Sequence, residues 1–458
     1  MKTLSYKTIV VLISLSLLLS QTACKKYLEV KSDQKLAVPS KLEELQGLLD
    51  NYSVLSQTAG GAAEASSDNI YLTSEDWNAL YQESERRLYT WQNDQVFAQD
   101  QSLNEWYCNY QAIYYANSVL KSLENIPIGL DNKLTWNNIK GQALFFRAQY
   151  FLRTAIVWSV AYDVQTAQTD PGIPLRLNDN FNEASVRSSV QETYNQILAD
   201  LKQAIVLLPT KPSHPAHPSK PAAYGLLARA HLAMRRYKEA GLYADSCLQI
   251  CSKLLDYNSL NSDDNYPIKQ FNEEVILWNR ILAPVYLTNT IAKIPADLYD
   301  SYEDNDLRKQ IFFTINPNQS ISFKGYYDGL PAPFGGIATD EVLLIRAECA
   351  ARLGDLLGAR NDLNTLLKNR YKTGTYQPIT ENIAVDLLAL ILSHRRKELL
   401  LRDLRWMDLK RFNKEGANIA LQRSMDGKSY SLQPNSPRYA MPIPEDVIAL
   451  SGMAQNKY

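Results

Sequence analysis

Apolar residues recur at steps of three and four along much of the chain, which is the spacing of one face of an α-helix. In residues 189–209 this face holds Tyr194, Ile197, Leu198, Leu201, Ile205 and Leu208. Ser189 and Glu192 form the signature of a capping box, and Pro209 closes the run. Segments 101–125 and 136–160 carry Tyr, Trp and Leu in the same way. The pattern predicts an all-α, mainly helical fold with little β-structure.

Two segments look like internal repeats. Residues 222–250 and 340–370 each hold a helix rich in small residues, a tight turn, and a second helix with Ala240 or Ala359 near its start. Small residues let two helices approach closely, and one such hairpin cannot bury its apolar face alone. This pattern is typical of tetratricopeptide-like hairpins, which repeat at roughly 34 residues. Because the two copies are not in tandem, we expect hairpins embedded in a larger helical scaffold.

Three regions lack this periodicity. Residues 57–98 and 257–338 are rich in Asn, Asp, Gly and Pro, with aromatic residues among them, and the tail 413–458 is also irregular. Long aperiodic stretches inside a compact domain are usually functional loops. We therefore expect the long stretch 257–338 to be functional.

The N-terminus carries Lys2 and Lys7, then the apolar run Ile9–Leu19, then small and polar residues. This order is typical of a secretory signal, which we place at residues 1–23. The apolar run is too short for a transmembrane helix, which needs about 20 residues. Cys24 follows the signal and has two readings: an incidental cysteine behind a trimmed signal, or a lipid attachment point.

Composition excludes some partners. The 458-residue chain is 45% hydrophobic and 21% charged, with a net charge of -1. These values are ordinary for a soluble globular protein, and they give no basic field for a nucleic-acid partner. The other four cysteines, Cys108, Cys247, Cys251 and Cys349, fit no zinc-ligand spacing. We expect them to be small buried apolar residues and expect no cofactor and no metal site, although a structural calcium ion stays open.

Catalytic signatures are absent from the sequence. H-E-x-x-H, G-x-S-x-G, the P-loop and G-x-G-x-x-G do not occur. We therefore expect no enzymatic activity, but paired carboxylates for glycoside hydrolysis depend on a three-dimensional separation that the sequence leaves open. His214 and His217 stand in the Pro-rich stretch 211–221. We interpret this stretch as a connector between two helices and not as a metal site.

Residues 394–412, HRRKELLLRDLRWMDLKRF, are dense in charge. Acidic and basic residues interleave at spacings that allow i,i+3 and i,i+4 pairs, through Glu398, Asp403, Asp408, Arg395, Arg402 and Arg405. We interpret this segment as a helix that carries a structural ion-pair network and not as a patch for nucleic acid or acidic lipid.

Five motifs in order resemble the SusD/RagB family of outer-membrane nutrient-binding lipoproteins over nearly the whole chain. The first, W-x3-Y-x2-I-x2-A/C-N, is matched by Trp106, Tyr110, Ile113 and Asn117. The second is matched by Ala143, Arg147 and Ala148, and DPGIPL follows it. The fourth lies in residues 394–412, and YAMPIPEDVIALSGMAQNKY ends the chain as the family ends.

Three positions depart from the family pattern. His394 stands where Glu is usual, and Arg402-Asp403 stand where Glu-Gly is usual. Both sites put local pairing in doubt. Gln21 occupies the position where lipid-attachment signals most often have Leu.

The resemblance implies about four tetratricopeptide-like helix pairs, with a loop-rich ligand-binding face. It implies a non-enzymatic protein that binds oligosaccharides, or peptides in some members, and passes them to a SusC-like TonB-dependent β-barrel transporter. It also implies a cell-surface location on the outer membrane, through a lipid on Cys24 with residues 24–35 as the tether. Residues 36–458 would be a single SusD-like domain.

Three alternatives to the glycan-binding function stay open. A peptide-binding member of the same fold would use hydrogen bonds to the ligand backbone in place of sugar stacking. A helical-repeat scaffold would bind only protein partners and show no small-ligand affinity. A hydrolase would release product from a purified glycan.

The candidate ligand-binding residues come from the irregular regions. A sugar ring binds between a flat aromatic face and convergent polar groups. The stretch SSDNIYLTSEDWNALY, residues 66–81, is either a loop held by the turn hydrogen bonds of Asp68 and Asn69 or a ligand platform. Each aromatic residue taken singly is more often core, but we expect the group to include the site: Asp68, Asn69, Trp77, Tyr81, Trp91, Tyr299, Tyr302, Tyr326 and Tyr327.

Overall fold

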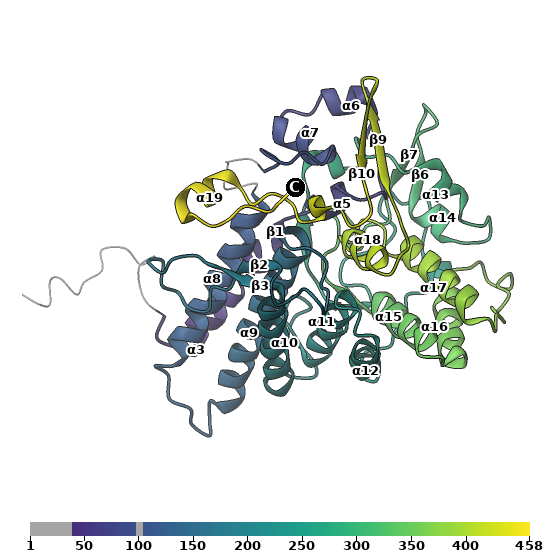
Figure 1. The fold of residues 1–458 in the computed structure, drawn as a ribbon. Coiled ribbons are helices and arrows are strands. Elements are labelled where there is room, and N and C mark those ends of the chain that lie inside the picture. The colour runs from purple at the N-terminus through teal and green to yellow at the C-terminus, as the bar shows by residue number, and fades with distance from the viewer. Residues whose placement is uncertain (1–38, 98–103) are drawn as a thin grey trace, which may run out of the picture. The chain divides into compact units, whose positions relative to one another are not determined.

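The computed structural model describes residues 39–97 and 104–458. Within them, Leu42–Tyr458 form one compact unit. The unit is mainly helical and tetratricopeptide-like, which confirms the predicted fold class (Figure 1). None of the described helices is long and apolar enough to cross a membrane. The predicted signal peptide, the tether and Cys24 lie outside the described residues.

Eight long helices of the described chain form a scaffold in which each helix packs on the next (Figure 1). Eight helices packed in this way match the number of helix pairs, about four, that the resemblance implied. They are α8 (Glu105–Leu123), α9 (Lys133–Trp158), α10 (Val190–Leu207), α11 (Lys220–Ala233), α12 (Tyr237–Leu248), α15 (Thr339–Arg352), α16 (Leu356–Lys368) and α17 (Ala384–Glu398). In addition, α3 (Leu42–Leu49) packs on α8 and α9.

Both predicted hairpins are present, as α11–α12 and α15–α16, and α12 packs on α15. The two repeats are therefore neighbours in space, although residues 257–338 separate them in the chain. The predicted capping box is also present at the start of α10. The Glu192 amide donates to Ser189 Oγ at 3.1 Å, and the Ser189 amide donates to Glu192 Oε2 at 2.8 Å.

Short elements make up the other side of the unit, where α6, α7 and the β9–β10 hairpin gather at the top of Figure 1. The short helices are α4 (Tyr52–Leu55), α5 (Ala62–Ala65), α6 (Ser74–Asn78), α7 (Glu83–Tyr89), α13 (Ala296–Asp300), α14 (Arg308–Ile311), α18 (Arg405–Lys414) and α19 (Glu445–Ser451). Single turns of 3-10 helix are η3 (Tyr257–Ser259), η4 (Val285–Leu287) and η5 (Pro437–Tyr439).

Five two-stranded sheets lie among these described elements. The antiparallel pairs are β2 (Pro171–Pro174) with β3 (Arg187–Ser189), β4 (Val275–Leu277) with β8 (Ile337–Ala338), β6 (Phe313–Ile315) with β7 (Ile321–Phe323), and β9 (Leu421–Met425) with β10 (Lys428–Leu432). The parallel pair is β1 (Gln57–Ala59) with β5 (Arg280–Leu282). The tail is therefore not simply irregular, because it holds the β9–β10 hairpin and α19.

The charge-dense segment 394–412 is not one continuous helix. It breaks after α17 and restarts at α18, and Leu401 and Asp403 between them take left-handed φ values of 55° and 59°. The segment does carry a structural ion-pair network, but the i,i+3 and i,i+4 pairs expected among its six named residues do not form in the described chain, and the pairs are mostly long-range and buried. Asp408 pairs with Arg411 three residues away and also with Arg395 at 2.9 Å.

The departures from the family pattern take part in this buried pairing. Arg402 pairs with Asp340 at 3.1 Å. The Asp403 amide donates to Glu64 Oε2 at 3.0 Å, and the Glu64 amide donates to Asp403 Oδ1 at 3.1 Å. His394 Nδ1 lies 3.2 Å from an Arg308 Nη2 donor. Burial and the Arg308 charge lower the pKa of His394 to about 2, so the imidazole is neutral and accepts this hydrogen bond.

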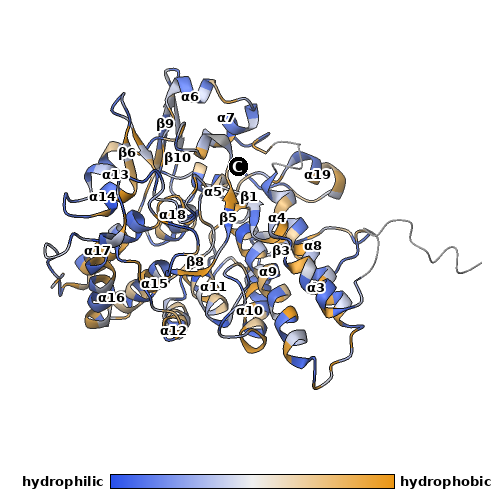
Figure 2. Ribbon diagram, turned by 180° about the vertical axis from the view of Figure 1, so that it is seen from behind, coloured by the Kyte–Doolittle hydropathy of each residue, from blue (hydrophilic) through white to orange (hydrophobic). Residues whose placement is uncertain are grey.

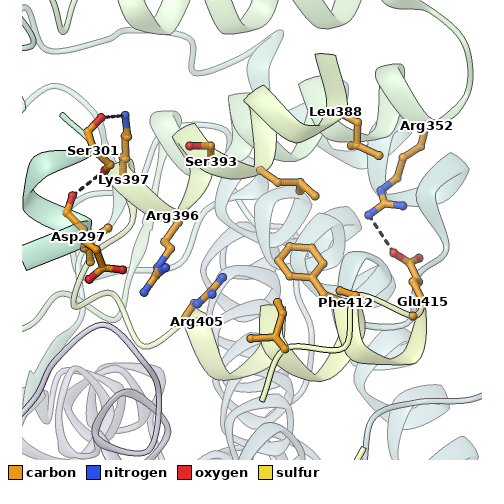
Figure 3. A pocket seen from close by; sticks show the side chains of 15 residues that line it. Asp297, Ser301, Arg352, Leu388, Ser393, Arg396, Lys397, Arg405, Phe412 and Glu415 are labelled. Atoms are coloured by element: carbon orange, nitrogen blue, oxygen red, sulfur yellow. Dashed lines mark hydrogen bonds and ion pairs between the residues drawn. The ribbon is translucent and has the colours of Figure 1, made fainter. Parts of the chain in front are cut away.

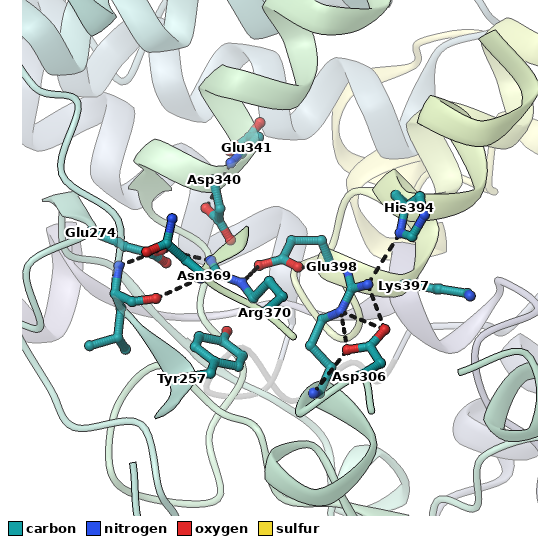
Figure 4. Close-up of polar contacts among 12 residues, drawn as sticks. Tyr257, Glu274, Asp306, Asp340, Glu341, Asn369, Arg370, His394, Lys397 and Glu398 are labelled. Atoms are coloured by element: carbon teal, nitrogen blue, oxygen red, sulfur yellow. Dashed lines mark hydrogen bonds and ion pairs between the residues drawn. The ribbon is translucent and has the colours of Figure 1, made fainter. Parts of the chain in front are cut away.

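A buried polar network joins the loop-rich side to the scaffold (Figure 4). Arg370, at the end of α16, donates to Glu274 Oε1 at 2.6 Å and to Glu398 Oε1 at 2.7 Å. Glu398 also accepts from Arg308 at 2.9 Å, and Arg308 binds Asp306 at 2.7 Å. All five side chains are fully buried. Charges this deep require partners, so the network fixes where segment 257–338 meets α16 and α17.

The apolar core runs through both sides of the unit. In Figure 2 the scaffold helices carry hydrophobic and hydrophilic stretches along their length, as expected for helices buried on some faces only. Cys247 and Cys349 are buried free thiols, as predicted. Cys108 and Cys251 are only half-buried, so the expectation of four buried cysteines is wrong for these two.

Candidate functional site

The parallel β1–β5 pair brings the two predicted loop regions together. Its register sets Gln57 opposite Arg280 and Ala59 opposite Leu282. The chain then turns at Gly61, where φ is 99° and a Cβ would lie 2.7 Å from Leu287. Only glycine meets both demands, because a side chain would strain the backbone and clash. The turn carries the chain into α5 beside the strand pair.

A pocket of about 360 Å³ opens beside this strand pair. It is lined from the first region, from the β5–η4 segment and from the first residue of α8. The lining residues are Ala59, Gly60, Ala62, Tyr81, Gln82, Ser84, Glu85, Leu88, Val96, Phe97, Glu105, Leu282, Ala283, Pro284 and Tyr286. We call it the Tyr81 pocket. It is built from residues 57–98 and 257–338, the two regions that the sequence predicted to form the ligand-binding face.

Tyr81 is the exposed aromatic residue of this pocket, with 94% of its surface accessible. It stands between α6 and α7, and that junction is fixed from both sides. Trp77 Nε1 donates to the Arg86 carbonyl at 3.1 Å, and the Arg86 guanidinium donates to the Leu80 carbonyl. Trp77 therefore holds the junction between α6 and α7 in place, while the Tyr81 ring is open to solvent.

Two carboxyl groups of the Tyr81 pocket have unused hydrogen-bonding capacity. Glu105 Oε2 accepts the Ala62 amide at 3.1 Å, but Oε1 has no hydrogen-bond partner among the described residues, and neither has Glu85 Oε2. Burial raises the pKa of Glu105 to about 8, with a contribution from the Asp403 charge, and burial also raises the pKa of Glu85. At neutral pH the Glu105 carboxyl is therefore largely protonated and can donate a hydrogen bond.

A neighbouring pocket of about 380 Å³ contains two other predicted residues, Asp68 and Trp91. Their polar groups are already used. Arg405 binds both Asp68 oxygens, at 2.7 and 2.9 Å, and Trp91 Nε1 donates to the Ser66 carbonyl at 3.0 Å. Burial raises the pKa of Asp68, but the hydrogen bonds and charge of Arg405 outweigh it and leave this pKa below its ordinary value.

A third pocket, of about 700 Å³, lies between α13, α17 and α18 (Figure 3). Phe412 stands between Arg405 on one side and the Arg352–Glu415 pair, at 2.9 Å, on the other (Figure 3). Lys397 donates to the Ser301 carbonyl. The charges of this pocket are thus largely paired within the fold, and none of the predicted ligand-binding residues lines it.

Most of the other predicted residues belong to the core. Tyr302, Tyr326 and Tyr327 are at most 2% exposed. Tyr327 donates to Glu274 at 2.7 Å or to Asp340 at 3.0 Å, so it is part of the buried network and has no free face for a sugar. These three predictions are corrected: the aromatic rings in segment 257–338 mostly pack on one another.

The last two predicted residues also make contacts within the fold. Asn69 is buried and donates to Glu64 Oε1 at 2.8 Å, so its side chain is used within the fold, through a bond to a side chain on α5 and not through a turn hydrogen bond. Tyr299 is half-buried, with its ring edge-to-face on Phe313 at 5.4 Å between centroids. Of the nine candidates, only Tyr81 lines the pocket that combines an exposed aromatic ring with unused polar groups.

Sequence reasoning missed Gln82, Glu85, Phe97 and Glu105 in this pocket. Gln82 could have been predicted, because it directly follows Tyr81 in the chain. Nothing in the sequence shows that Glu105, at a helix start, meets strand β5. No cluster of three or more His, Cys, Asp or Glu side chains that could hold a metal occurs in the described part of the chain.

Comparisons with known families agree with this architecture. Residues 26–232 match a family described as "Starch-binding associating with outer membrane", and residues 339–458 match one described as "SusD family". The chain belongs to the SusD/RagB family. A comparison with curated proteins finds no match.

Solved structures with the same SusD fold cover nearly the whole chain. A putative sugar binding protein from Bacteroides vulgatus is 18% identical with a TM-score of 0.75, covering 92% of this chain and 99% of its own. A SusD superfamily protein from Bacteroides thetaiotaomicron is 18% identical with a TM-score of 0.74, covering 91% and 100%. A SusD-like carbohydrate binding protein from Bacteroides vulgatus is 22% identical with a TM-score of 0.70, covering 90% and 97%. At these identities the likeness establishes the fold.

Proposed function

We propose that this SusD/RagB family member is a non-enzymatic, cell-surface glycan-binding lipoprotein that captures oligosaccharides in the Tyr81 pocket. The observation that carries the proposal is an exposed aromatic ring beside two carboxyl oxygens that have no hydrogen-bond partner among the described residues. Such a pocket suits a sugar ring, which has an apolar face and a hydroxyl rim. The family description, which names starch binding and the outer membrane, supports the same ligand class.

The lining of the pocket also indicates the ligand's charge. Among the described lining residues no side chain is basic, and the ionisable acids are Glu85 and Glu105. A carboxylate or sulfate on the sugar would meet no cation in this described lining, because Arg153, whose charge acts on Glu105, does not line the pocket. We propose that the pocket takes uncharged glycans and rejects uronic acids and sulfated sugars.

The proposal extends to location and partner. A lipid on Cys24, carried on the tether 24–35, would hold the protein at the outer membrane surface, where a SusC-like TonB-dependent transporter would accept the glycan. We expect Cys24→Ser to release the protein from the outer membrane fraction, because the variant has no acceptor thiol. Mass spectrometry of the mature N-terminus checks the chemistry: a lipid-free N-terminus in the parent protein would contradict the anchor.

Tyr81→Ala is the first test of the binding pocket. We expect affinity for the best oligosaccharide on a glycan array, remeasured by calorimetry, to fall about tenfold or more, which corresponds to about 1.4 kcal/mol of lost binding energy. Tyr107→Ala, at an exposed tyrosine of α8 that lines none of these pockets, is the matched control and should bind as the parent does.

Two further arms separate the rival functions. Tyr71→Ala tests the pocket that contains Asp68 and Trp91, where Tyr71 is 38% exposed. If Tyr71→Ala lowers the glycan affinity and Tyr81→Ala does not, the glycan binds in that pocket. Binding on a peptide array and not on the glycan array would favour the peptide-binding alternative. Sustained release of product from the bound glycan, abolished by Glu85→Gln or Glu105→Gln, would show a hydrolase.

A further inference from the structure

One face of α8 carries an aromatic stripe outside the Tyr81 pocket. Trp106, Tyr110 and Tyr114 are four residues apart, and Asn117 follows three residues later, so all four share a face of the helix. Trp106 and Tyr110 pack at 4.8 Å between ring centroids. The sequence spacing alone favours an ordinary core stripe. The far end of the stripe is different, because Tyr114 is only half-buried and packs on an exposed loop residue.

That covering residue is Phe181, which is 76% exposed and lies 4.4 Å from Tyr114 between centroids, with the planes tilted by 31°. A contact that served only to bury Tyr114 would not need a second aromatic ring that is itself exposed to solvent. A single exposed phenylalanine is ordinary, but here its ring lies on that of Tyr114 and both rings line one pocket. Aromatic surface grouped in this way favours contact with another molecule.

The loop that carries Phe181 is held by its own side chains. The Arg176 guanidinium donates to the Glu183 carbonyl at 2.5 Å and to the Asn180 carbonyl. Asn178 Oδ1 accepts the Asn180 amide at 2.9 Å. From α8, Asn117 Nδ2 donates to the Arg176 and Asn178 carbonyls at 2.8 and 3.1 Å. The ring of Phe181 is therefore presented from a fixed loop, which lowers the entropy cost of binding to it.

Between stripe and loop lies a pocket of about 260 Å³. Trp106, Tyr110, Tyr114 and Phe181 supply aromatic surface, and Asp179 and Asn180 stand at its polar edge. No hydrogen bond joins the Asp179 carboxylate to another side chain or amide in the described part of the chain. The volume lies below the roughly 300–1,000 Å³ of pockets for drug-sized ligands, so it suits a single ring.

We propose that this Phe181 pocket is a second carbohydrate subsite, which holds one pyranose ring against Phe181 and Tyr114 with Asp179 as a hydroxyl acceptor. The inference rests on the proposed glycan-binding function and deepens it. Glu105 lines the Tyr81 pocket and the next residue, Trp106, lines the Phe181 pocket, so the two pockets adjoin at the start of α8. Tyr114 lies eight residues further along the helix, about 12 Å from Trp106. A glycan that reaches both would gain affinity from the second contact through a raised effective concentration.

The test uses single-ring probes, so that it does not depend on which oligosaccharide the Tyr81 pocket prefers. Methyl glycosides of glucose, galactose, mannose, xylose, arabinose, rhamnose and N-acetylglucosamine are screened by saturation-transfer NMR at tens of millimolar. The protein carries Tyr81→Ala, which weakens the first pocket. We expect at least one glycoside to give a signal, and Phe181→Ala added to this variant to remove most of it.

Val186→Ala is the matched control, since Val186 is 72% exposed near the same loop and does not line the pocket. It should leave the signal unchanged, and circular dichroism should show all variants folded. The absence of any Phe181-dependent signal overturns the second subsite, whatever the oligosaccharide assay shows for Tyr81. Loss of transporter co-purification in Phe181→Ala without a sugar signal would also overturn it, by showing a protein contact. If the signal depends on Phe181 but Tyr81→Ala does not change the affinity for oligosaccharides, this subsite stands and the Tyr81 pocket is excluded as a binding site.

Discussion

Arg370→Met should lower the free energy of unfolding by about 3–5 kcal/mol, the cost of removing one partner from a buried ion pair. Arg370 is fully buried, and its guanidinium binds Glu274, Glu398 and the Leu255 carbonyl. Methionine fills much of the same volume but leaves two carboxyls without that donor. Urea denaturation followed by circular dichroism measures the loss. The loss of unfolding free energy should be smaller at acid pH, where the carboxyls left without the guanidinium can be protonated.

Arg346→Met is the matched control for this prediction. Arg346 also binds two carboxylates, Asp245 and Asp362, at 2.7 and 2.8 Å, but its side chain is 31% exposed. Water can replace the lost partner there, so we expect a loss of about 1 kcal/mol or less. Equal losses in the two variants would show that burial of the Arg370 network contributes nothing special to stability.

The helical part of the fold was predictable because its signals are local. The capping box at Ser189 and the 3.6-residue spacing of apolar residues in α10 depend only on neighbours in the chain. The break at Leu401 and Asp403 was not predictable from sequence. There the continuous charge pattern favours one helix, and long-range bonds from Glu64 and Asp340 decide otherwise.

The candidate pocket lies in the loop regions that the sequence singled out, but most of the residues named from the sequence do not line it. Turn-rich sequence located the two loop segments, and β1–β5 does join them. Within them, aromatic identity could not separate Tyr81 from Tyr327, because the difference is whether the ring finds buried partners. Tyr327 has Glu274 and Asp340, which lie 53 and 13 residues away in the chain, and Tyr81 has none of this kind.

The second large effect concerns a group of buried acids beneath the Tyr81 pocket. Burial raises the pKa of Glu105 to about 8 and that of Glu64 to about 7, and burial also raises the pKa of Asp403. The positive charge of Arg153 acts against burial, because it lowers the pKa of Glu105 and of Asp403. In the unfolded chain these carboxyls titrate near pH 4–4.5.

The sign of the pH effect follows from that difference. A carboxyl with a raised folded-state pKa favours the folded protein while it is protonated, so its contribution is full below about pH 4.5. The contribution is lost as the pH rises through the folded-state value, about 8 for Glu105. Each unit of pKa shift corresponds to about 1.4 kcal/mol, so the parent protein should lose a few kcal/mol of stability between these limits.

Glu105→Gln should flatten that loss, because glutamine keeps an acceptor for the Ala62 amide and never ionises. At pH 8 the variant should be more stable than the parent, and the two should converge near pH 4.5, with unfolding free energies measured by urea denaturation at each pH. Glu43→Gln, at an exposed carboxyl of α3, should shift the whole curve without changing its slope above pH 5. Glutamine also keeps a hydrogen-bond donor at the pocket floor. Glycan affinity should therefore persist above pH 8 in the variant and fall in the parent, and a parent affinity independent of pH would exclude protonated Glu105 as a ligand donor.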